Sequence, residues 1–323
     1  MNKKKIIFIS GPTASGKTST SISIAKALIE SGTPCEIVNF DSLLFYKELS
    51  IGTAKPTQEE MDGVKHHLVS TQSAKEPLNA SEFLKQADIL LKEITEAAIV
   101  PIFVGGSAFY LRAFIKGMYE TAPISEKTKQ EVQNLYKENG ISFFRDFLKE
   151  NDPDSYNSLH ENDHYRNLRA YEYYIENQHP ISDQKKKLDE LSPYDFSINR
   201  LNEFDIHHIY LDLDKEDHWN IIVKRCEEMV ETGLINEMET LLSNGFTGEE
   251  KPLKSIGYKE TLQYINGEFK SQSDYIERMS ISTRQLAKSQ RTFFKKVEPK
   301  KSYHPINDRK LIIKEAQEFI SNN

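Results

Sequence analysis

Short apolar runs separated by amphipathic stretches dominate the first 118 residues and the region after residue 200. Four runs have the length and composition of buried strands, at residues 6–9, 36–40, 99–104 and 206–212. Apolar residues spaced by three and four predict helices at residues 22–29, 81–97, 216–231, 234–242 and 273–297. Because strands that alternate with helices form parallel sheets, this pattern predicts an α/β fold.

The pattern changes between residues 119 and 193. That stretch is rich in Lys, Glu, Asn and Tyr, and it contains no convincing buried strand. We interpret it as an all-helical module inserted into the α/β core. The predicted domains are the core at residues 1–118, the helical insertion at 119–193, and a third part at 194–323 that completes the core with a strand and adds C-terminal helices.

The composition is typical of a soluble globular protein. With 323 residues, 38% of them hydrophobic, the chain can form one large or two moderate domains. The apolar run after the basic N-terminus has four residues, which is too short for a signal peptide or a membrane span. The two cysteines, Cys35 and Cys226, have no metal-like spacing and indicate no disulfide framework. We expect a cytoplasmic protein that does not bind membranes.

The formal net charge of −7 argues weakly against nucleic acid as a partner, but the charge is unevenly distributed. In the predicted helix at 273–297, basic residues recur at i, i+4, i+7 and i+11, namely Arg284, Lys288, Arg291 and Lys295. They lie roughly opposite an apolar seam of Ile276, Met279, Leu286, Phe293 and Val297. Residues 278–297 contain no Asp or Glu. This face is either ordinary solvated charge or an anion-binding surface.

Directly after the first apolar run comes Gly11-Pro12-Thr13-Ala14-Ser15-Gly16-Lys17-Thr18, which matches G-x-x-x-x-G-K-[ST] at every fixed position. The two glycines permit a loop whose N–H groups point at an anion, Lys17 adds positive charge, and the Thr18 hydroxyl can reach a magnesium ion. We predict a diphosphate-binding loop with Mg²⁺ at Thr18. The fold class is then a P-loop NTPase-like, doubly wound parallel sheet with an inserted all-helical module and C-terminal helices.

Three further residues are candidates for the site. Asp41 follows the run at 36–40, at the sheet edge where ligands bind, and could be a magnesium ligand, a helix N-cap or a general base. Ser107 follows Gly105 and Gly106, and it could cap a helix, donate to a phosphate, or do both. Arg225, in the helix at 216–231, could form a surface ion pair or clamp a phosphate.

The segment His160-Glu161-Asn162-Asp163-His164 fits the H-E-x-x-H zinc pattern. Its central Asn-Asp favours a loop that caps the next helix, so we do not expect zinc there. Arg166 and Arg169, on one face of that helix, could form a lid, a nucleic-acid contact or a solvated surface. The neighbours His66 and His67 diverge in an extended segment, and we expect them to be structural.

Two longer strings are far more specific than the loop motif, Ile51-Gly52-Thr53-Ala54-Lys55-Pro56 and Thr283-Arg284-Gln285-Leu286-Ala287-Lys288. With them occur Asp41-Ser42 and Tyr46, His66-His67-Leu68, Gly105-Gly106-Ser107 and Tyr110, Asp152-Pro153 through Arg169-Ala170, and Ser255-Ile256-Gly257-Tyr258. In this order, over most of the chain, they resemble the tRNA dimethylallyltransferases, also called isopentenyl-diphosphate:tRNA transferases. Small kinases do not carry these strings.

The resemblance implies transfer of a dimethylallyl group from dimethylallyl diphosphate to N6 of an adenine beside the tRNA anticodon, at position 37, with release of diphosphate and with Mg²⁺ as cofactor. It implies that Asp41 takes the proton from N6, and that Thr18, Arg225 and Ser107 complete the catalytic set. It also implies contacts with the anticodon stem-loop of tRNA by Asp41, Ser42, Leu43, Leu44, Ser107, Lys129, Tyr165, Arg166, Asn167, Leu168, Arg169, Lys254, Ser255, Ile256, Gly257, Tyr258 and Lys259. On the basic helix we add Arg284, Lys288 and Arg291. We expect a monomer.

The chain departs from the family at three positions: Ser107 stands where the family usually has Thr, Ser289 where it often has Arg, and Leu43-Leu44 where many members have Gln. Two other functions stay open. One is a small-molecule P-loop kinase, which leaves the helical insertion and the basic helix without a role. The other is isopentenyl transfer to free AMP, ADP or ATP, which needs no extended basic helix. A tRNA-directed enzyme differs from both in the steep salt dependence of acceptor binding.

Overall fold

The structure is a computed structural model, and it describes residues 3–118, 124–188 and 192–322. It divides into two compact units, one made of Met1–Ile115 and Phe196–Asn323, the other of Lys116–Asp195. The second unit interrupts the first in sequence, and it is wider than the predicted insertion, beginning at 116 against 119 and ending at 195 against 193. Residue 119, the predicted start, lies outside the described residues.

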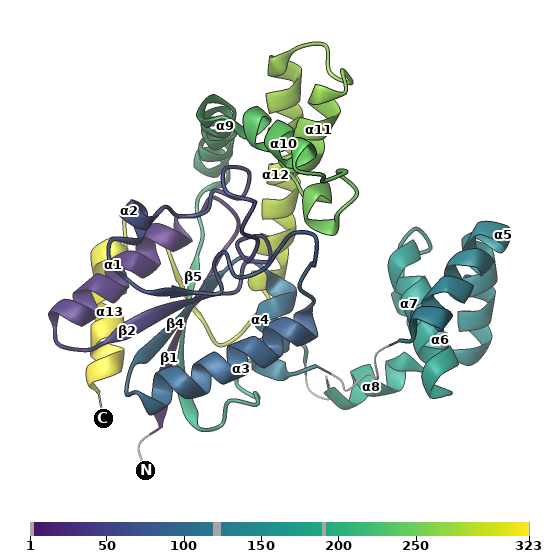
Figure 1. Cartoon of the computed structure of the whole chain (residues 1–323). Coiled ribbons are helices and arrows are strands. Elements are labelled where there is room, and N and C mark those ends of the chain that lie inside the picture. Colours follow the sequence, from purple (N-terminus) through teal and green to yellow (C-terminus); the bar gives the residue numbers. More distant parts are fainter. Residues whose placement is uncertain (1–2, 119–123, 189–191, 323) are drawn as a thin grey trace. The chain divides into compact units, whose positions relative to one another are not determined.

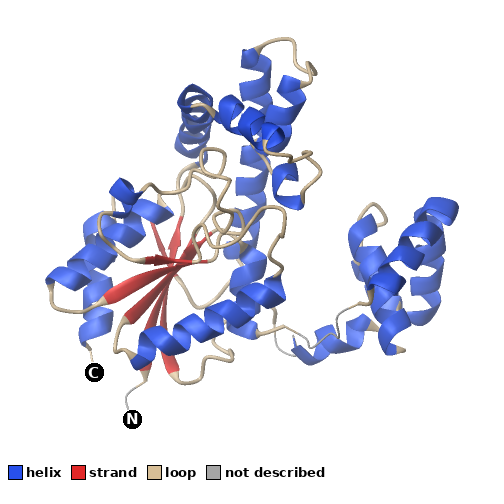
Figure 2. Cartoon of the chain, in the orientation of Figure 1, coloured by secondary structure: helices blue, strands red, loops and turns tan. Residues whose placement is uncertain are grey.

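A six-stranded parallel sheet forms the centre of the first unit, with strand order β3-β2-β4-β1-β5-β6 (Figure 1, Figure 2). Its strands are β1 (Lys4–Ser10), β2 (Cys35–Asn39), β3 (His66–His67), β4 (Val100–Gly105), β5 (Phe204–Leu211) and β6 (Lys301–Tyr303). Ile7 of β1 pairs with Ile102 on one side and His207 on the other. The predicted α/β fold and its four strands are confirmed. The edge strands β3 and β6 were missed because they are two and three residues long and lack an apolar run.

Helices cover both faces of the sheet, because alternate residues of each strand point to opposite sides and both sides are apolar. Ile7 belongs to a core shared with two helices on one face, and Phe8 faces the other, with its ring centroid 5.3 Å from that of Phe103. Phe114 extends this aromatic layer, 4.5 Å from Phe103. The helices concerned are α1 (Lys17–Glu30) and α13 (Arg309–Ser321) on the first face, and α3 (Ala80–Glu96) and α4 (Ala108–Lys116) on the second. The short α2 (Gln58–Met61) precedes β3.

The helices after β5 build a second core. They are α9 (Lys215–Thr232), α10 (Leu234–Ser243), the 3₁₀ helix η1 (Lys251–Lys254), α11 (Tyr258–Ile265) and α12 (Gln272–Phe294). The predicted helix at 273–297 is present as α12, but its faces differ from the prediction. Leu286, assigned to the apolar seam, is 39% exposed, whereas the Arg291 side chain, assigned to the solvent face, is only 13% exposed. The buried face includes Ser280 and Ser282, which an argument from apolar spacing treats as solvent-facing.

In its described residues, the regular structure of the second unit is helical: α5 (Glu126–Asn151), α6 (Pro153–Ser158), α7 (His164–Asn177) and α8 (Ile181–Leu188). Side chains of Ser125, Asp152 and Asp163 cap the first three helices by accepting from backbone N–H groups. Two small hydrophobic clusters, around Leu148 and around Phe144, hold the helices together. Across the described ranges of both units, we find no helix with the length and apolar character needed to cross a bilayer.

Candidate functional site

The Gly-rich loop connects the carboxyl end of β1 to the first turn of α1. Gly16 has a φ of 74° there, a conformation that other residues rarely adopt. Gly11 is required for a different reason, since a Cβ at this position would lie 2.6 Å from the Leu211 carbonyl oxygen and 2.7 Å from Ser15 Oγ. The loop therefore packs closely against the end of β5, at the carboxyl edge of the sheet where ligands bind in such folds.

Three charged side chains, Lys17, Asp41 and Arg225, influence one another at this edge. Lys17 Nζ donates to the Pro12 carbonyl at 2.7 Å. Burial lowers the pKa of Lys17 from 10.5 to about 8, an effect that Asp41 opposes and Arg225 reinforces. Burial also lowers the pKa of Arg225, and Asp41 again opposes it. The fold thus brings residues from the loop, the end of β2 and α9 together, and the two partly desolvated cations favour an anionic ligand.

Asp41 begins a turn, not a helix. Its Oδ1 accepts from the Leu43 N–H at 3.2 Å, and residues 42–45 form turns, so the interpretation as a helix N-cap is wrong. The neighbouring Ser42 N–H donates to Ser107 Oγ at 3.0 Å, which ties the loop after β2 to the loop after β4. Asp41 Oδ2 lies 3.5 Å from the position that a Cβ on Gly106 would take. One carboxylate oxygen is therefore held by the turn, and the other lies beside bare backbone.

Leu43 and Leu44 follow in the same turn, and both are half-buried. Leu43 packs against the core of the C-terminal helices. The Leu44 carbonyl accepts from the Ser70 N–H at 2.9 Å. Apolar packing accounts for the leucine at position 43.

The donor atoms around the loop fit a diphosphate with a magnesium ion. Ser15 Oγ is buried without a hydrogen-bond partner, which is costly unless a ligand oxygen or water pairs with it. The Thr18 hydroxyl and the Asp41 carboxylate are oxygen donors of the kind that Mg²⁺ prefers. Within the described residues, no group of three or more His, Cys, Asp or Glu side chains could hold a metal ion. An ion at Thr18 would therefore complete its coordination with ligand phosphates and water.

Two residues that hold the loop, Gln290 and His218, were missed from the sequence. Gln290 Oε1 accepts from the Thr13 N–H at 2.7 Å, and Gln290 Nε2 donates to the Gly106 carbonyl at 2.9 Å. His218 Nε2 lies 2.8 Å from the Thr13 carbonyl oxygen. Thr13 is 277 positions from Gln290 and 205 from His218 in the sequence, so no local pattern could reveal these contacts.

A carboxylate holds residues 50–52, which include the first two residues of the string at 51–56. Glu237 Oε2 accepts from the N–H groups of Ser50 at 3.1 Å and Ile51 at 2.8 Å. Glu237 Oε1 accepts from the Gly52 N–H at 3.2 Å and from the Tyr258 hydroxyl. Tyr258 is fully buried, and burial together with Glu237 raises its pKa. The structure therefore corrects the prediction that the Tyr258 side chain contacts tRNA, because its hydroxyl is used inside the fold.

Around Tyr258, the predicted tRNA segment exposes Lys254 and Lys259. Lys254 Nζ lies 2.8 Å from Glu249 Oε2, an exposed ion pair that contributes little stability. Between the lysines, Ser255 and Ile256 are half-buried and Gly257 is buried. Two charged side chains of this segment are thus accessible.

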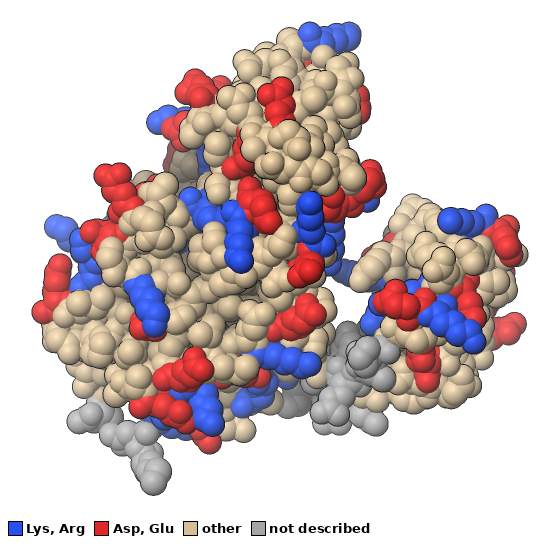
Figure 3. Space-filling view, viewed as in Figure 1, with Lys and Arg blue, Asp and Glu red and all other residues tan. Residues whose placement is uncertain are grey.

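The predicted basic surface of α12 is smaller than expected. Arg284 and Lys288 are exposed, and the Arg284 guanidinium lies 4.8 Å from the ring centroid of Trp219. Arg291 points inward, where its Nε donates to Asp212 Oδ1 at 2.7 Å. Because its charge is neutralised inside the fold, the structure corrects the prediction that Arg291 contacts tRNA. On the face of the first unit drawn in Figure 3, basic and acidic side chains are interspersed.

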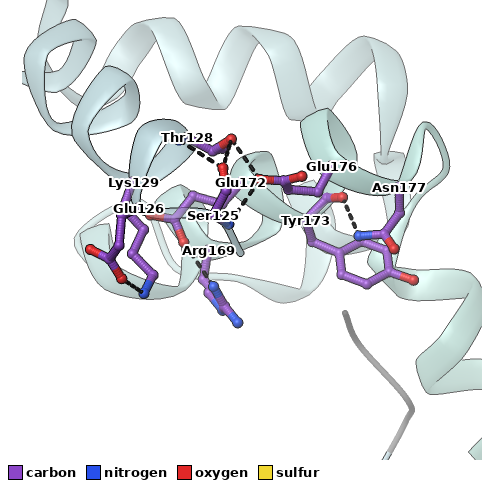
Figure 4. Close-up of polar contacts among 9 residues, drawn as sticks. All are labelled: Ser125, Glu126, Thr128, Lys129, Arg169, Glu172, Tyr173, Glu176 and Asn177. Carbon is purple, nitrogen blue, oxygen red and sulfur yellow. Dashed lines mark hydrogen bonds and ion pairs between the residues drawn. The ribbon is translucent and has the colours of Figure 1, made fainter. Parts of the chain in front are cut away.

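In the second unit, two predicted tRNA contacts have acidic neighbours on the same helix (Figure 4). Lys129 Nζ lies 2.6 Å from Glu126 Oε1, and Arg169 Nη1 lies 3.1 Å from Glu172 Oε2. The Lys129 and Arg169 side chains are 44% and 36% exposed. The pair of Lys129 with Glu126 is exposed and weak in water, so Lys129 can exchange this partner for a phosphate. The Glu172 side chain is only 11% exposed, so Arg169 has a largely buried partner.

The first turns of α7 contain both exposed and buried candidates. Tyr165 is 76% exposed, and Arg166 is exposed beside it. Asn167 and Leu168 are buried, and Asn167 Nδ2 donates to the His160 carbonyl at 3.0 Å. These two side chains stabilise the unit itself, so the structure corrects the prediction that they contact tRNA.

His160 and His164 do not share a helix face. His160 lies before the helix, and its Nδ1 accepts from the Asn162 N–H at 3.1 Å. His164 is the first residue of α7, and its Nδ1 lies 2.6 Å from the Tyr136 hydroxyl. The expected capping of α7 by Asp163 is confirmed, and the two histidines do not form the helical H-E-x-x-H arrangement of a zinc site.

Comparison with known proteins gives the family. A family model described as IPP transferase matches residues 44–297. The chain belongs to the IPP transferase family. It is 32% identical to the tRNA dimethylallyltransferase of Borrelia turicatae over 97% of this chain and 98% of that protein. It is 36% identical to the tRNA dimethylallyltransferase of Macrococcus caseolyticus over 91% of this chain and 88% of that protein.

Solved structures agree with this membership of the IPP transferase family. The crystal structure of a tRNA delta(2)-isopentenylpyrophosphate transferase from Staphylococcus epidermidis is 31% identical, with a TM-score of 0.66 over 98% of this chain and 99% of that one. A crystal structure of a eukaryotic dimethylallyltransferase acting on tRNA is 26% identical, with a TM-score of 0.77 over 99% of this chain and 80% of that one. Both similarities extend over the Gly-rich loop as well as the range of the family model.

Proposed function

We propose that this chain transfers a dimethylallyl group from dimethylallyl diphosphate to N6 of the adenine beside the tRNA anticodon and releases diphosphate. The observation that carries the proposal is the carboxylate of Asp41 next to the Gly-rich loop and two partly desolvated cations, Lys17 and Arg225. Family relatives named tRNA dimethylallyltransferase support the same reaction.

The leaving group is stabilised first. The bond that breaks joins the allylic carbon to a diphosphate oxygen, so the diphosphate gains negative charge in the transition state. In the proposed reaction the N–H groups of the loop, Lys17 and Arg225 bind that charge. Diphosphate binding then favours the protonated form of Lys17, whose pKa is lowered by burial. When bound at Thr18, Mg²⁺ supplies further positive charge to the diphosphate.

The nucleophile needs a proton acceptor. The lone pair of an adenine amino group is delocalised into the ring, so losing a proton makes N6 a better nucleophile. Asp41 Oδ1 is occupied by the Leu43 N–H, which leaves Oδ2, beside Gly106, to take this proton. The Ser107 hydroxyl, which accepts from the Ser42 N–H, holds the turn of Asp41 in place.

The tRNA itself is proposed to meet cations on both units and an aromatic ring on the second. These are the exposed Lys254, Lys259, Arg284 and Lys288 on the first unit, and on the second the exposed Tyr165 and Arg166 with the half-buried Lys129 and Arg169. Phosphate contacts by such cations position an RNA, and an exposed ring such as Tyr165 can stack on an unpaired base. A target adenine in the anticodon loop must leave its stack before N6 can react. The adenine position, the monomeric state and the cytoplasmic location stay predictions.

The test is transfer of label from radiolabelled dimethylallyl diphosphate, with Mg²⁺, to unmodified tRNA and in parallel to AMP. We expect label in tRNA that is lost with Asp41→Ala. Label in AMP alone would instead indicate an enzyme of free nucleotides. Absence of label in both, together with phosphate transfer from ATP, would indicate a kinase.

A further inference from the structure

The backbone N–H and C=O of Thr13, in the middle of the Gly-rich loop, are both bonded by side chains from outside the loop. Its N–H donates to Gln290 Oε1 at 2.7 Å, and its carbonyl oxygen lies 2.8 Å from His218 Nε2. The next residue, Ala14, has a φ of 60°, a left-handed conformation that costs free energy in a residue with a side chain. Such a conformation persists where its surroundings hold it in place.

The contacts of His218 determine which ring nitrogen carries the proton. A carbonyl oxygen can only accept, so Nε2 carries the hydrogen and donates to Thr13. Nδ1 then has a lone pair, and it faces Arg291 Nη2, a donor, at 2.8 Å. The ring is 2% exposed, and burial lowers its pKa, as expected of a neutral imidazole with these two bonds.

Arg291 is oriented in turn by the end of β5. Its Nε donates to Asp212 Oδ1 at 2.7 Å, and its Nη2 donates to the Leu213 carbonyl at 3.3 Å. The ion pair with Asp212 is largely buried, with 13% and 24% of the two side chains exposed. The contacts therefore run in one direction, from Asp212 through Arg291 and His218 to the carbonyl of Thr13.

We propose that His218, oriented by Arg291 and Asp212, is a positioning residue that sets the direction of the Ala14 N–H in the diphosphate-binding loop. In a trans peptide the carbonyl and the following N–H point in opposite directions. The bond from His218 to the Thr13 carbonyl therefore turns the Ala14 N–H away from α9. This proposal depends on the proposed function in one respect, namely that the ligand of the loop is a diphosphate.

The test compares variants that remove or keep the two bonds of His218. His218→Leu removes both, whereas His218→Gln keeps a donor for Thr13 and an acceptor for Arg291. Arg291→Met removes the orienting side chain, and Lys288→Gln is the matched change of an exposed cation on the same helix. The probe is Mg²⁺-pyrophosphate without tRNA, measured by calorimetry or by the fluorescence of Trp219, the single tryptophan, which adjoins His218.

We expect His218→Leu and Arg291→Met to weaken pyrophosphate binding by about fivefold each, the effect of one hydrogen bond. The double variant should be no weaker than either single one, because the two residues act through each other. His218→Gln should bind nearly as the wild type. In transfer assays the KM for dimethylallyl diphosphate should rise while tRNA affinity stays unchanged. Lys288→Gln should do the reverse, with weaker tRNA binding and unchanged pyrophosphate affinity.

Two results would overturn the proposal. The first is an Arg291→Met variant with unchanged pyrophosphate affinity and with weaker, less salt-dependent tRNA binding, which would make Arg291 a nucleic-acid contact. The second is equal weakening by His218→Gln and His218→Leu at unchanged unfolding midpoints. If His218→Leu does not fold, His218→Asn takes its place, since its amide is too short to reach both partners. A protein whose pyrophosphate binding depends on His218 but which does not prenylate tRNA refutes only the proposed function.

Discussion

Replacing Glu237 by Gln should destabilise the first unit strongly, although the two side chains have nearly the same shape. The carboxylate accepts from three backbone N–H groups, those of Ser50, Ile51 and Gly52, and from the Tyr258 hydroxyl. All four partners are donors, so the site requires four acceptor positions. A glutamine offers one oxygen and one NH₂ group in their place.

The magnitude follows from this count. If the amide oxygen takes the place of Oε2, the NH₂ group faces the Gly52 N–H and the Tyr258 hydroxyl. The hydroxyl can rotate and accept, but the Gly52 N–H loses its acceptor, at a cost of about 1 to 3 kcal/mol. The remaining bonds change from charge-assisted to neutral, which removes about 1 kcal/mol more. We expect a total loss of about 2 to 4 kcal/mol in the free energy of unfolding.

The assay is urea unfolding, with amide hydrogen exchange at residues 50–52 as the local readout. Tyr258→Phe is the matched control, because it removes one of the four donors and leaves the three backbone bonds; it should cost only about 1 kcal/mol. A Glu237→Gln protein within 0.5 kcal/mol of the wild type, with unchanged exchange at residues 50–52, would refute the reasoning. That result would mean that water compensates the hydrogen bonds lost with the carboxylate, so that the free energy of unfolding stays about the same as in the wild type.

Three further predictions concern the loop and its neighbour Asp41. Lys17 has a folded pKa of about 8 against 10.5 unfolded, so its contribution to stability rises with pH between these values, because there the unfolded chain binds more protons. A bound diphosphate favours the charged form of Lys17, so Lys17 should take up a proton when Mg²⁺-pyrophosphate binds. Calorimetry at pH 8.5 in two buffers should detect this uptake in the wild type and not in Lys17→Met. Equal proton uptake by both proteins would contradict the prediction. Asp41→Asn should lower kcat by about 10²- to 10⁴-fold with little change in KM, measured in single-turnover transfer to tRNA. Asp62→Asn, an exposed carboxylate 56% accessible, is its control and should transfer at the wild-type rate. Gly11→Ala should lower the free energy of unfolding, measured in urea, by about 1 to 3 kcal/mol and should weaken pyrophosphate binding, because its Cβ would meet the Leu211 carbonyl. A urea midpoint equal to that of the wild type would show that the loop can move away.

Local sequence patterns were enough to predict the α/β fold of this protein. The central strands, the Gly-rich loop and the main helices follow from apolar spacing and from one motif, because hydrogen bonds within a helix and alternation along a strand depend on near neighbours. The position of Asp41 after a buried strand was also sufficient to place it at the carboxyl edge of the sheet, since parallel strands end together. The family could likewise be inferred from short strings such as the one at residues 51–56.

Only the tertiary structure decided how the side chains around the loop are used. Gln290 and His218 reach Thr13 across more than 200 residues, and Glu237 reaches residues 50–52 across more than 180. Arg291 has the spacing of a surface cation, yet Asp212 at the end of β5 turns it inward. A sequence pattern indicates which face of a helix is apolar. The position of a buried polar or charged side chain depends instead on the partner that satisfies its hydrogen bonds. That partner can be distant in the sequence, and it is known only from the folded structure.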